Sequence, residues 1–258
     1  MDREGTAGRA PTLVLGKIAQ ILNCFSLKAP ELTQQQIIKK TGLPSSTCQR
    51  LVQDLVLEGF LDRDDDSYRI GVGLVRWSAP GTLGMDVVRL VKPVLQDLRD
   101  ETGESACFYI RDGVVRTVVA VAATRHVVMR PFMVGMVMPL HAGAPGKVFL
   151  AFDPDARKAL VEASELTRFT PDTPDNLDLL DRQAAVRSLG YYAAFEERNV
   201  GVGSISAPVF NHTGELAGAL GLGFPTQRVT PADVDRLGST AASAAAVATD
   251  RLGYVKAS

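Results

Sequence analysis

The chain has little of what marks disulfide-bonded or metal-binding proteins. Only three of its 258 residues are cysteines, and Cys24, Cys48 and Cys107 are too far apart for the short spacing of a zinc site. An odd number of cysteines also argues against a disulfide framework and favours a reducing compartment. We therefore expect three buried thiols that pack as small hydrophobic side chains, and no metal site.

Long apolar runs are missing as well. No run approaches the about 18 residues that identify a membrane-spanning helix. The segment Met1 to Ala10 is short and polar and contains Gly and Ala, unlike a signal peptide. Because 46% of the residues are hydrophobic, the chain can still form packed cores. The sequence predicts a folded, cytoplasmic protein without membrane contact.

An excess of charge is also absent. The formal net charge is −1, and residues 11–76 hold eight Lys or Arg against seven Asp or Glu, a net of +1 (8 − 7). This balance excludes binding to nucleic acid by bulk electrostatics. Because clustered phosphate contacts contribute much of the affinity for DNA, a DNA-binding role would require two or more copies acting together.

Sequence motifs of nucleotide-binding proteins and hydrolases are not found. The glycine-rich stretches 201–203 and 218–223 lack the lysine of a phosphate-binding loop and the dinucleotide fingerprint. Ser204 could be combined with His141 and Glu197 into a triad, but it does not lie in a G-x-S-x-G nucleophile elbow. We expect no enzyme activity and no cofactor.

What the sequence does contain is a helix-turn-helix pattern in residues 32–71. Thr33 and Gln36 form a capping box that begins a helix, and Gly42 ends it. After Leu43-Pro44, Ser45 or Ser46 is the expected N-cap of a second helix. An apolar stripe on that helix has the i, i+3, i+4, i+7 spacing, formed by Cys48, Leu51, Val52 and Leu55. The opposite face carries hydrogen-bonding side chains that can pair with base edges, namely Ser46, Gln49, Arg50 and Gln53.

The neighbouring segments complete a small unit. A first helix is predicted from about Thr12 to Phe25, and its expected inner face consists of Val14, Ile18, Ile21, Leu22 and Phe25. Gly59 ends the second helix of the pair, and residues 60–61 and 68–70 flank a polar loop as a short hairpin. Residues 72–86, with several Gly and Pro, indicate a connector with a short helix around residues 74–77, broken at Pro80.

Residues 87–258 predict a second unit of different character. A helical pattern runs from Asp86 to Thr102, with Pro93 either as a kink or as the start of its second part. The strands expected at 106–111 and 114–121 are joined by Asp112-Gly113, a two-residue hairpin signal. Further strands are expected at 191–195, 204–210 and 216–224, and helices after Gly146, after Pro154, at about 176–189 and from Thr230-Pro231 onward. The prediction is an antiparallel sheet flanked by helices.

These residues and their order resemble the IclR family of bacterial transcriptional regulators over nearly the whole chain. The matching residues of the first unit are Leu32-Thr33, Thr41 to Pro44, Ser46-Thr47, Arg50 to Val52, Leu55, Gly59 to Leu61 and Tyr68 to Gly71. Those of the second unit are Thr102 to Glu104, Leu140 to Ala142, Gly146-Lys147, Gly190-Tyr191, Glu197 and Ser204 to Asn211.

The resemblance implies an α+β protein with two domains. Residues 1–11 would form a flexible tail, 12–71 a winged helix-turn-helix DNA-binding domain, 72–86 a linker, and 87–258 a GAF-like effector-binding and oligomerisation domain with a curved antiparallel sheet. It also implies a homodimer, or a dimer of dimers, that binds a palindromic double-stranded DNA operator under the control of a small-molecule effector. The alternative is a ligand sensor that acts through protein contacts without specific DNA reading.

The expected DNA contacts lie on the helix pair and at the base of the hairpin. They are Thr33, Gln35, Ser45, Ser46, Thr47, Gln49, Arg50, Gln53, Arg63 and Arg69. The hairpin tip Asp64-Asp65-Asp66 departs from the partly basic tips of the family, and we expect it to avoid phosphates because like charges repel. The alternative for Gln49, Arg50 and Gln53 is a solvated helix face without a partner.

The residues expected to bind the effector are Met129, Met133, Ala144, Pro145, Gly146, Ala194, Ser204 and Gly221. Members of the family offer amides of the turn 141–147 to ligand carboxylates, and Pro145 removes one such donor. Ala194 stands where the family commonly has Asp or Ser. Both changes favour an organic acid or related compound with an aromatic or other apolar part.

Several assignments in this unit have a structural alternative. The group Met129, Met133, Met136 and Met138 can form an adaptable wall of the effector cavity, or else a gap-filling core or dimer contact. Ser204 can bind the ligand, or its hydroxyl can bond within the sheet. His141 and Glu197 can be structural, and His126 and His212 are expected in solvent.

Overall fold

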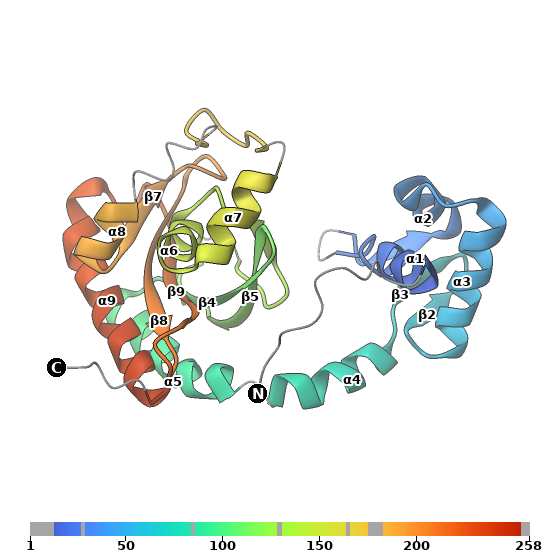
Figure 1. Ribbon diagram of the computed structural model, residues 1–258, viewed down its shortest axis with the longest axis horizontal. Helices are drawn as coiled ribbons and strands as arrows, with labels where there is room; N and C mark the ends of the chain where they lie inside the picture. Colours follow the sequence, from blue (N-terminus) through green and yellow to red (C-terminus); the bar gives the residue numbers. More distant parts are fainter. Residues whose placement is uncertain are drawn as a thin grey trace. The chain divides into compact units, whose positions relative to one another are not determined.

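The computed structural model describes residues 13–26, 29–83, 86–127, 131–163, 166–174 and 183–253 (Figure 1). The chain divides into two compact units, residues 1–84 and 85–258. Among the described residues, no helix is both long and apolar enough to cross a bilayer. All three cysteines are buried and free, as expected.

The first unit combines helices with a three-stranded antiparallel sheet of order β1-β3-β2. Its elements are α1 (Leu13–Leu22), β1 (Glu31–Thr33), α2 (Gln34–Thr41), α3 (Ser45–Leu57), β2 (Leu61–Asp64), β3 (Ser67–Ile70) and α4 (Val72–Leu83). The β2–β3 hairpin, called the wing below, confirms the predicted hairpin. Strand β1 was not expected, because its three residues coincide with the predicted cap of α2.

The two helices of the predicted pair begin differently. At α2 the capping box is confirmed, since Gln36 N donates to Thr33 Oγ1 (3.3 Å) and Thr33 N donates to Gln36 Oε1 (2.8 Å). Gly42 ends α2 at φ +66°. At α3 the expected serine cap is wrong: Pro44 is the N-cap, and no side chain caps the helix. The backbone of Pro44 is extended (φ −53°, ψ 136°), and its carbonyl accepts from Cys48 N at 2.9 Å. Both serines therefore lie in the first helical turn.

The core of this unit confirms the apolar stripe of α3. Cys48, Leu51, Val52 and Leu55 are all buried, together with Ile21 of α1. The expected inward position of Val14 is wrong, because this side chain is 53% exposed. The part of α1 that packs on the core begins at Ile18, so the first turn of the helix lies beyond it.

Residues 72–83 form one helix, so the predicted short helix broken at Pro80 is wrong. A proline removes one helical hydrogen bond, and α4 continues in spite of that loss. Its beginning is fixed by backbone contacts that the sequence pattern does not reveal: Gly73 N donates to Gly59 O (3.0 Å). A Cβ at residue 73 would lie 2.3 Å from that oxygen, so this approach requires glycine.

The second unit is built on one six-stranded antiparallel sheet of order β6-β5-β4-β9-β8-β7. The sheet curls, with helices on both faces (Figure 1). Its elements are α5 (Asp86–Thr102), β4 (Ser105–Asp112), β5 (Val115–Ala122), β6 (Val137–Pro139), α6 (Ala144–Phe152), α7 (Pro154–Glu162), α8 (Gln183–Leu189), β7 (Tyr192–Phe195), β8 (Val202–Phe210), β9 (Leu216–Pro225), a 3-10 turn (Pro231–Asp233) and α9 (Val234–Arg251).

Each face of this sheet has its own core. Helices α5 and α9 pack on one face, where Leu95, Phe108 and Ile205 are fully buried. Helix α6 packs on the other face with α7, around Leu140 and Phe149. The predicted α+β class and the antiparallel hairpins are confirmed. Pro93 lies inside a continuous α5.

Two segments differ from the expected elements. Strand β6 was not predicted, because residues 137–139 belong to the methionine group and pair with β5 only through tertiary contacts. The helix expected at about 176–189 is described from Gln183 onward, as α8, and its earlier part lies outside the described residues.

Candidate functional site

The first candidate site is the exposed face of α3. Burial of the apolar stripe turns Ser45, Ser46, Gln49, Arg50 and Gln53 outward, and all five are exposed. Thr47 is half-buried. An outward row of amide, hydroxyl and guanidinium groups on a surface helix matches the donor and acceptor pattern of base edges in a major groove.

The residues expected to support α3 lie on α2 and the wing. Gln35 is exposed on α2, and Thr33 is half-buried with its hydroxyl engaged in the capping box. Arg63 and Arg69 are exposed on the wing, but both contact acidic wing residues. Arg63 Nε donates to Asp65 O (2.9 Å), and Arg69 Nε lies 3.7 Å from Asp62 Oδ2.

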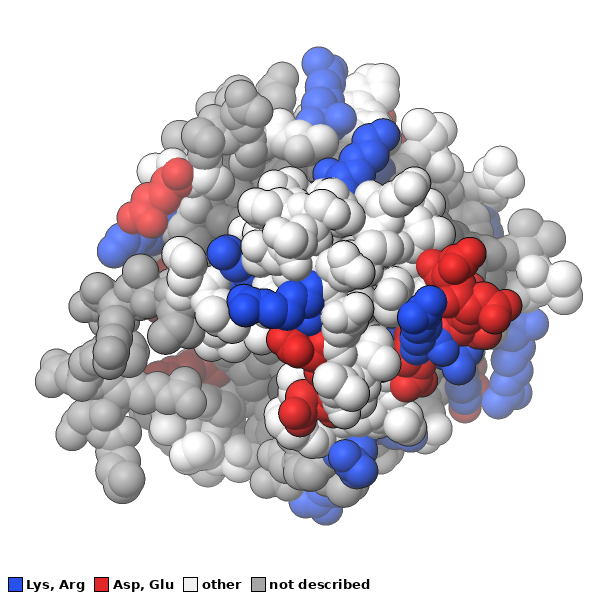
Figure 2. All heavy atoms as spheres, turned by 90° about the vertical axis from the view of Figure 1, so that its right-hand side faces the viewer, with Lys and Arg blue, Asp and Glu red and all other residues white. Residues whose placement is uncertain are grey.

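The charge on this side of the molecule is correspondingly low. Figure 2, which shows the right-hand side of Figure 1, has mainly uncharged side chains, scattered basic ones and one gathering of acidic side chains. Four of the residues from Asp62 to Asp66 are aspartates. The wing is therefore acidic, as its sequence suggested.

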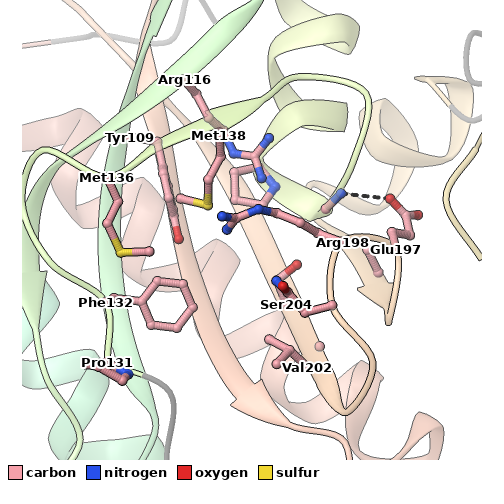
Figure 3. Close-up of a pocket in the computed structure, with 15 residues that line it drawn as sticks. Tyr109, Arg116, Pro131, Phe132, Met136, Met138, Glu197, Arg198, Val202 and Ser204 are labelled. Carbon is pink, nitrogen blue, oxygen red and sulfur yellow. Dashed lines mark hydrogen bonds between the residues drawn. The ribbon is translucent and has the colours of Figure 1, made fainter. Parts of the chain in front are cut away.

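The second candidate site is a pocket in the second unit (Figure 3). It lies between β4, β5, β6, the start of α6 and the segment from β7 to β8. Its lining consists of Tyr109, Arg116, Pro131, Phe132, Met136, Met138, Gly143, Pro145, Ala194, Glu197, Arg198, Asn199, Val202, Gly203 and Ser204. Apolar side chains and two arginines thus face the same space.

The start of α6 borders this pocket, and its amides already have acceptors. Gly143 N donates to Glu197 Oε2 (2.8 Å), and Ala144 N donates to Ser204 Oγ (3.0 Å). Pro145 has no amide hydrogen, and Gly146 N donates to Gly143 O (3.1 Å). The turn therefore directs its donors to groups of the protein itself.

Arg116 is the most deeply buried cation of the pocket lining, and the residue is 2% exposed. It donates through Nη1 to Pro139 O and through Nη2 to Ala142 O (2.8 Å). Its guanidinium also lies over the Tyr109 ring, 5.7 Å from the centroid. Burial lowers the pKa of Arg116 to about 10, so the side chain is charged at neutral pH.

A buried ion pair supports the same wall. Lys147 of α6 and Glu197 are 1% and 5% exposed, and Lys147 Nζ contacts Glu197 Oε2 and donates to His141 O (2.7 Å). Glu197 thus joins α6 to the segment after β7. His141 has a structural environment: its Nε2 lies 2.9 Å from Thr167 O and its ring stacks on Phe169. Burial lowers the pKa of His141.

The structure brings some of the expected effector residues together and leaves others apart. Pro145, Ala194 and Ser204 line the pocket. Ala144 contributes its amide to Ser204, while Gly146 packs beneath the turn, where a Cβ would lie 1.8 Å from Leu140 O.

Besides Ala144 and Gly146, three more of the expected residues are not among the described residues of the lining. Met133 is 43% exposed and lies outside it, whereas Met136 and Met138 of the same group line the pocket. Gly221 lies within the sheet, opposite Ser206, because β9 packs there against β8. Met129 falls outside the described residues.

The two serines of β8 have different roles. Ser206 is fully buried and donates to Leu220 O (2.7 Å), so its hydroxyl bonds within the sheet. Ser204 faces the pocket and accepts from α6. Ser204 thus borders the pocket, and its contact with the effector stays a prediction.

Sequence reasoning missed Tyr109, Arg116 and Arg198. A signal existed for Arg116, because Arg116, Val118, Ala120 and Ala122 alternate along β5 and are all buried. Arginine is rarely buried without a specific role. A single arginine among the apolar residues of the buried face of a strand therefore indicates a functional or structural site. Tyr109 and Arg198 carried no comparable signal.

Comparison with known proteins identifies both units. The family model of the IclR helix-turn-helix domain matches residues 14–65, and that of the bacterial transcriptional regulator IclR C-terminal domain matches residues 82–249. The regulator XynR of Escherichia coli is 31% identical over 239 residues, which cover 91% of this chain and 95% of XynR. The regulator KipR of Bacillus subtilis is 28% identical over 243 residues, or 92% of this chain and 96% of KipR.

Solved structures share the fold. A putative IclR regulator from a Silicibacter species superposes with a TM-score of 0.82 at 24% identity, covering 94% of this chain and 97% of its own. An IclR homologue from Microbacterium hydrocarbonoxydans, complexed with 4-hydroxybenzoate, has a TM-score of 0.79 at 22% identity and covers 93% of this chain and 98% of its own. The relatives are named as transcriptional regulators and not as enzymes. This chain belongs to the IclR family of bacterial transcriptional regulators, with an N-terminal helix-turn-helix DNA-binding domain and a C-terminal effector-binding domain.

Proposed function

We propose that the protein is a dimeric regulator that reads a palindromic operator with α3 and responds to an organic acid with an aromatic or other apolar part. The observation that carries the DNA-reading part is the exposed polar face of α3 over a fully packed apolar stripe. In winged helix-turn-helix proteins such a helix enters the major groove, and two-fold pairing sets the spacing of the half-sites.

Two exposed apolar stretches support pairing of subunits through the first unit. The first turn of α1 exposes Leu13, Val14 and Leu15, and α4 exposes Val72 and Trp77, each by more than half. Exposed apolar groups of this size commonly mark a protein interface. Pairing also compensates for the low net charge of residues 11–76, because two copies double the phosphate contacts. A dimer of dimers would add contacts between the second units.

The apolar lining of the pocket supports an effector with an apolar part. Phe132, Met136, Met138 and Val202 form its wall, and Ala194 and Pro145 add no hydrogen-bonding side chain. The fold is shared with a homologue that was crystallised with 4-hydroxybenzoate. Effector control requires that the ligand bind the DNA-competent and incompetent states with different affinities. We assign the connecting role between the domains to residues 72–86, which include α4.

Selection of bound duplexes from a random-sequence DNA pool tests the DNA-reading part. We expect a reproducible motif with two inverted half-sites. Recovery of unrelated sequences would instead favour a sensor that acts through protein contacts. Thermal-shift screening of aromatic and aliphatic acids, followed by operator titration with the compound that binds, tests the effector part.

The acidic wing leads to a prediction about salt dependence. We expect the double variant Asp65→Asn, Asp66→Asn to bind the selected operator about two- to fivefold more tightly at low salt, since two charges that repel phosphates are removed. Asparagine suits residue 65, whose φ is +48°. The gain should shrink as added salt screens the repulsion. Gel-shift titrations at several salt concentrations measure it, with Glu162→Gln on α7 as the control. Unchanged affinity at low salt would mean that the wing tip lies away from the DNA backbone.

A further inference from the structure

An unpaired donor lies in the wall of the pocket. Arg116 is buried, and its two terminal nitrogens donate to the carbonyls of Pro139 and Ala142. Within the described part of the chain, its Nε–H has no hydrogen-bond partner. A buried donor without an acceptor carries its full desolvation penalty, so the site gains stability when a ligand supplies an acceptor.

Among the described residues, no carboxylate forms a direct ion pair with Arg116, although the charge of Glu197 raises the pKa of this arginine. Its hydrogen-bond acceptors are neutral carbonyls. Glu197, the carboxylate of the pocket lining, holds Lys147. A buried cation is stable when it is paired with an anion. This guanidinium therefore favours an anionic ligand.

A second guanidinium approaches from the opposite wall. Arg198 follows β7 and lines the same pocket. Figure 3 shows the side chains of Arg116 and Arg198 pointing toward one another above Ser204. Burial and, to a smaller extent, the charge of Arg198 lower the pKa of Arg116, while Tyr109 and Glu197 raise it. An anion between the two guanidinium groups would offset their mutual repulsion, because it attracts both and can accept hydrogen bonds from both.

The turn before α6 does not offer an equivalent place for the anion. The amides of Gly143 and Ala144 already donate to Glu197 and Ser204, and Pro145 has none. A carboxylate there would have to displace two existing hydrogen bonds. The amides of the turn are already hydrogen-bonded, whereas the Nε–H of Arg116 is not.

The apolar side of the pocket is filled by a ring of the protein. A Cβ added at Gly223 would lie 2.4 Å from Cε2 and Cζ of Phe132, so this ring rests on the bare backbone of β9. The remaining cavity has a volume of about 40 Å³, far below the about 150 Å³ of a cavity that takes up benzene. A ligand ring therefore needs the place that Phe132 occupies.

We infer that the effector is an aromatic monocarboxylate whose carboxylate binds between Arg116 and Arg198, and whose ring takes the place of Phe132 on Gly223. This inference rests on the proposed ligand-sensing function and assigns the ligand's chemistry and its anchoring residues. The Phe132 ring therefore competes with the ligand ring for this place. A neutral aromatic compound would fill only the place of the ring, and a small aliphatic acid would contact only the two arginines.

Calorimetric titration of the full-length protein tests the charge requirement with benzoate and its neutral isostere benzamide. We expect benzoate to bind at least about tenfold more tightly, because charge-assisted hydrogen bonds to two arginines are lost with the amide. Arg198→Gln should reduce benzoate affinity severalfold and leave benzamide affinity unchanged. Arg116→Lys retains a charge and should also weaken benzoate. If Arg116→Lys fails to fold, the benzoate–benzamide ratio in the wild type decides the matter.

The same titrations test the role of the ring. We expect Phe132→Ala to bind benzoate about five- to tenfold more tightly while acetate affinity is unchanged, and Phe169→Ala, outside the pocket, to behave as wild type. Equal affinity for benzoate and benzamide, no saturable binding of benzoate at millimolar concentration, or weaker benzoate binding by Phe132→Ala would each overturn the inference. Because no DNA is present, these outcomes are separate from operator binding, which a gel shift without ligand measures.

Discussion

Replacing Lys147 by methionine is expected to lower the free energy of unfolding of the second unit by about 3–5 kcal/mol. Lys147 is 1% exposed, and its Nζ contacts the Glu197 carboxylate and the His141 carbonyl. Methionine fills a similar volume but leaves the charge of Glu197 buried without its cation. Breaking one side of a buried ion pair is costly for this reason. Urea denaturation followed by circular dichroism measures the loss.

The double variant Lys147→Met, Glu197→Gln separates the charge effect from the packing effect. Glutamine retains an oxygen that can accept from Gly143 N, which donates to Glu197 in the wild type. We expect the double variant to recover at least half of the stability that the single variant loses. Lys158→Met on the exposed side of α7 is the control and should change stability by less than about 0.5 kcal/mol. A double variant less stable than Lys147→Met would show that the charge of Glu197 is compensated elsewhere.

Replacing Arg50 by alanine is expected to weaken operator binding by about tenfold or more, with the fold unchanged. Arg50 is exposed on α3, on the face opposite the buried stripe, so its removal leaves no cavity. A side chain that pairs with a base edge contributes about 1–3 kcal/mol of discrimination. Gel-shift titration with the selected operator measures the loss, and circular dichroism verifies the fold.

Two comparison variants define what Arg50 contributes. Arg50→Lys retains the charge but not the bidentate geometry, so its affinity should lie between those of the wild type and the alanine variant. Arg76→Ala removes an exposed arginine from α4 and should weaken binding less. If Arg50 reads a base, its loss also relaxes the preference at one operator position, whereas a phosphate contact would weaken all sequences alike. Equal operator affinity for Arg50→Ala and the wild type would place this side chain outside the DNA interface.

The local elements of the first unit were predictable because their causes are local. A capping box involves residues three positions apart, and the stripe of α3 repeats within two helical turns. The same holds for the Asp112-Gly113 hairpin, where Gly113 adopts φ +58°. The error in the N-cap of α3 is also local. The sequence predicted Ser45 or Ser46, whereas the extended backbone of the neighbouring Pro44 makes that residue the N-cap.

The errors at Val14 and Pro80 have a different origin. Periodicity shows which residues of a helix share a face, but not how far along the helix the core extends. For α1 the core begins at Ile18, which leaves Val14 exposed. For α4 the helix begins where Gly73 meets the Gly59 carbonyl, a contact between segments that no local pattern encodes.

The sequence by itself determined the helix-turn-helix, the outward polar face with Arg50, the antiparallel class of the second unit and the family. Tertiary structure alone decided which residues form the pocket. Tyr109, Arg116, Met138 and Arg198 come from separate strands and a loop, and meet because the register of the sheet and the approach of α6 bring them together. The use of the turn's amides by Glu197 and Ser204 likewise depends on partners more than 50 positions away. Local hydrogen bonding and periodicity depend on residues that are close in the sequence, whereas the geometry of a pocket depends on packing between distant segments.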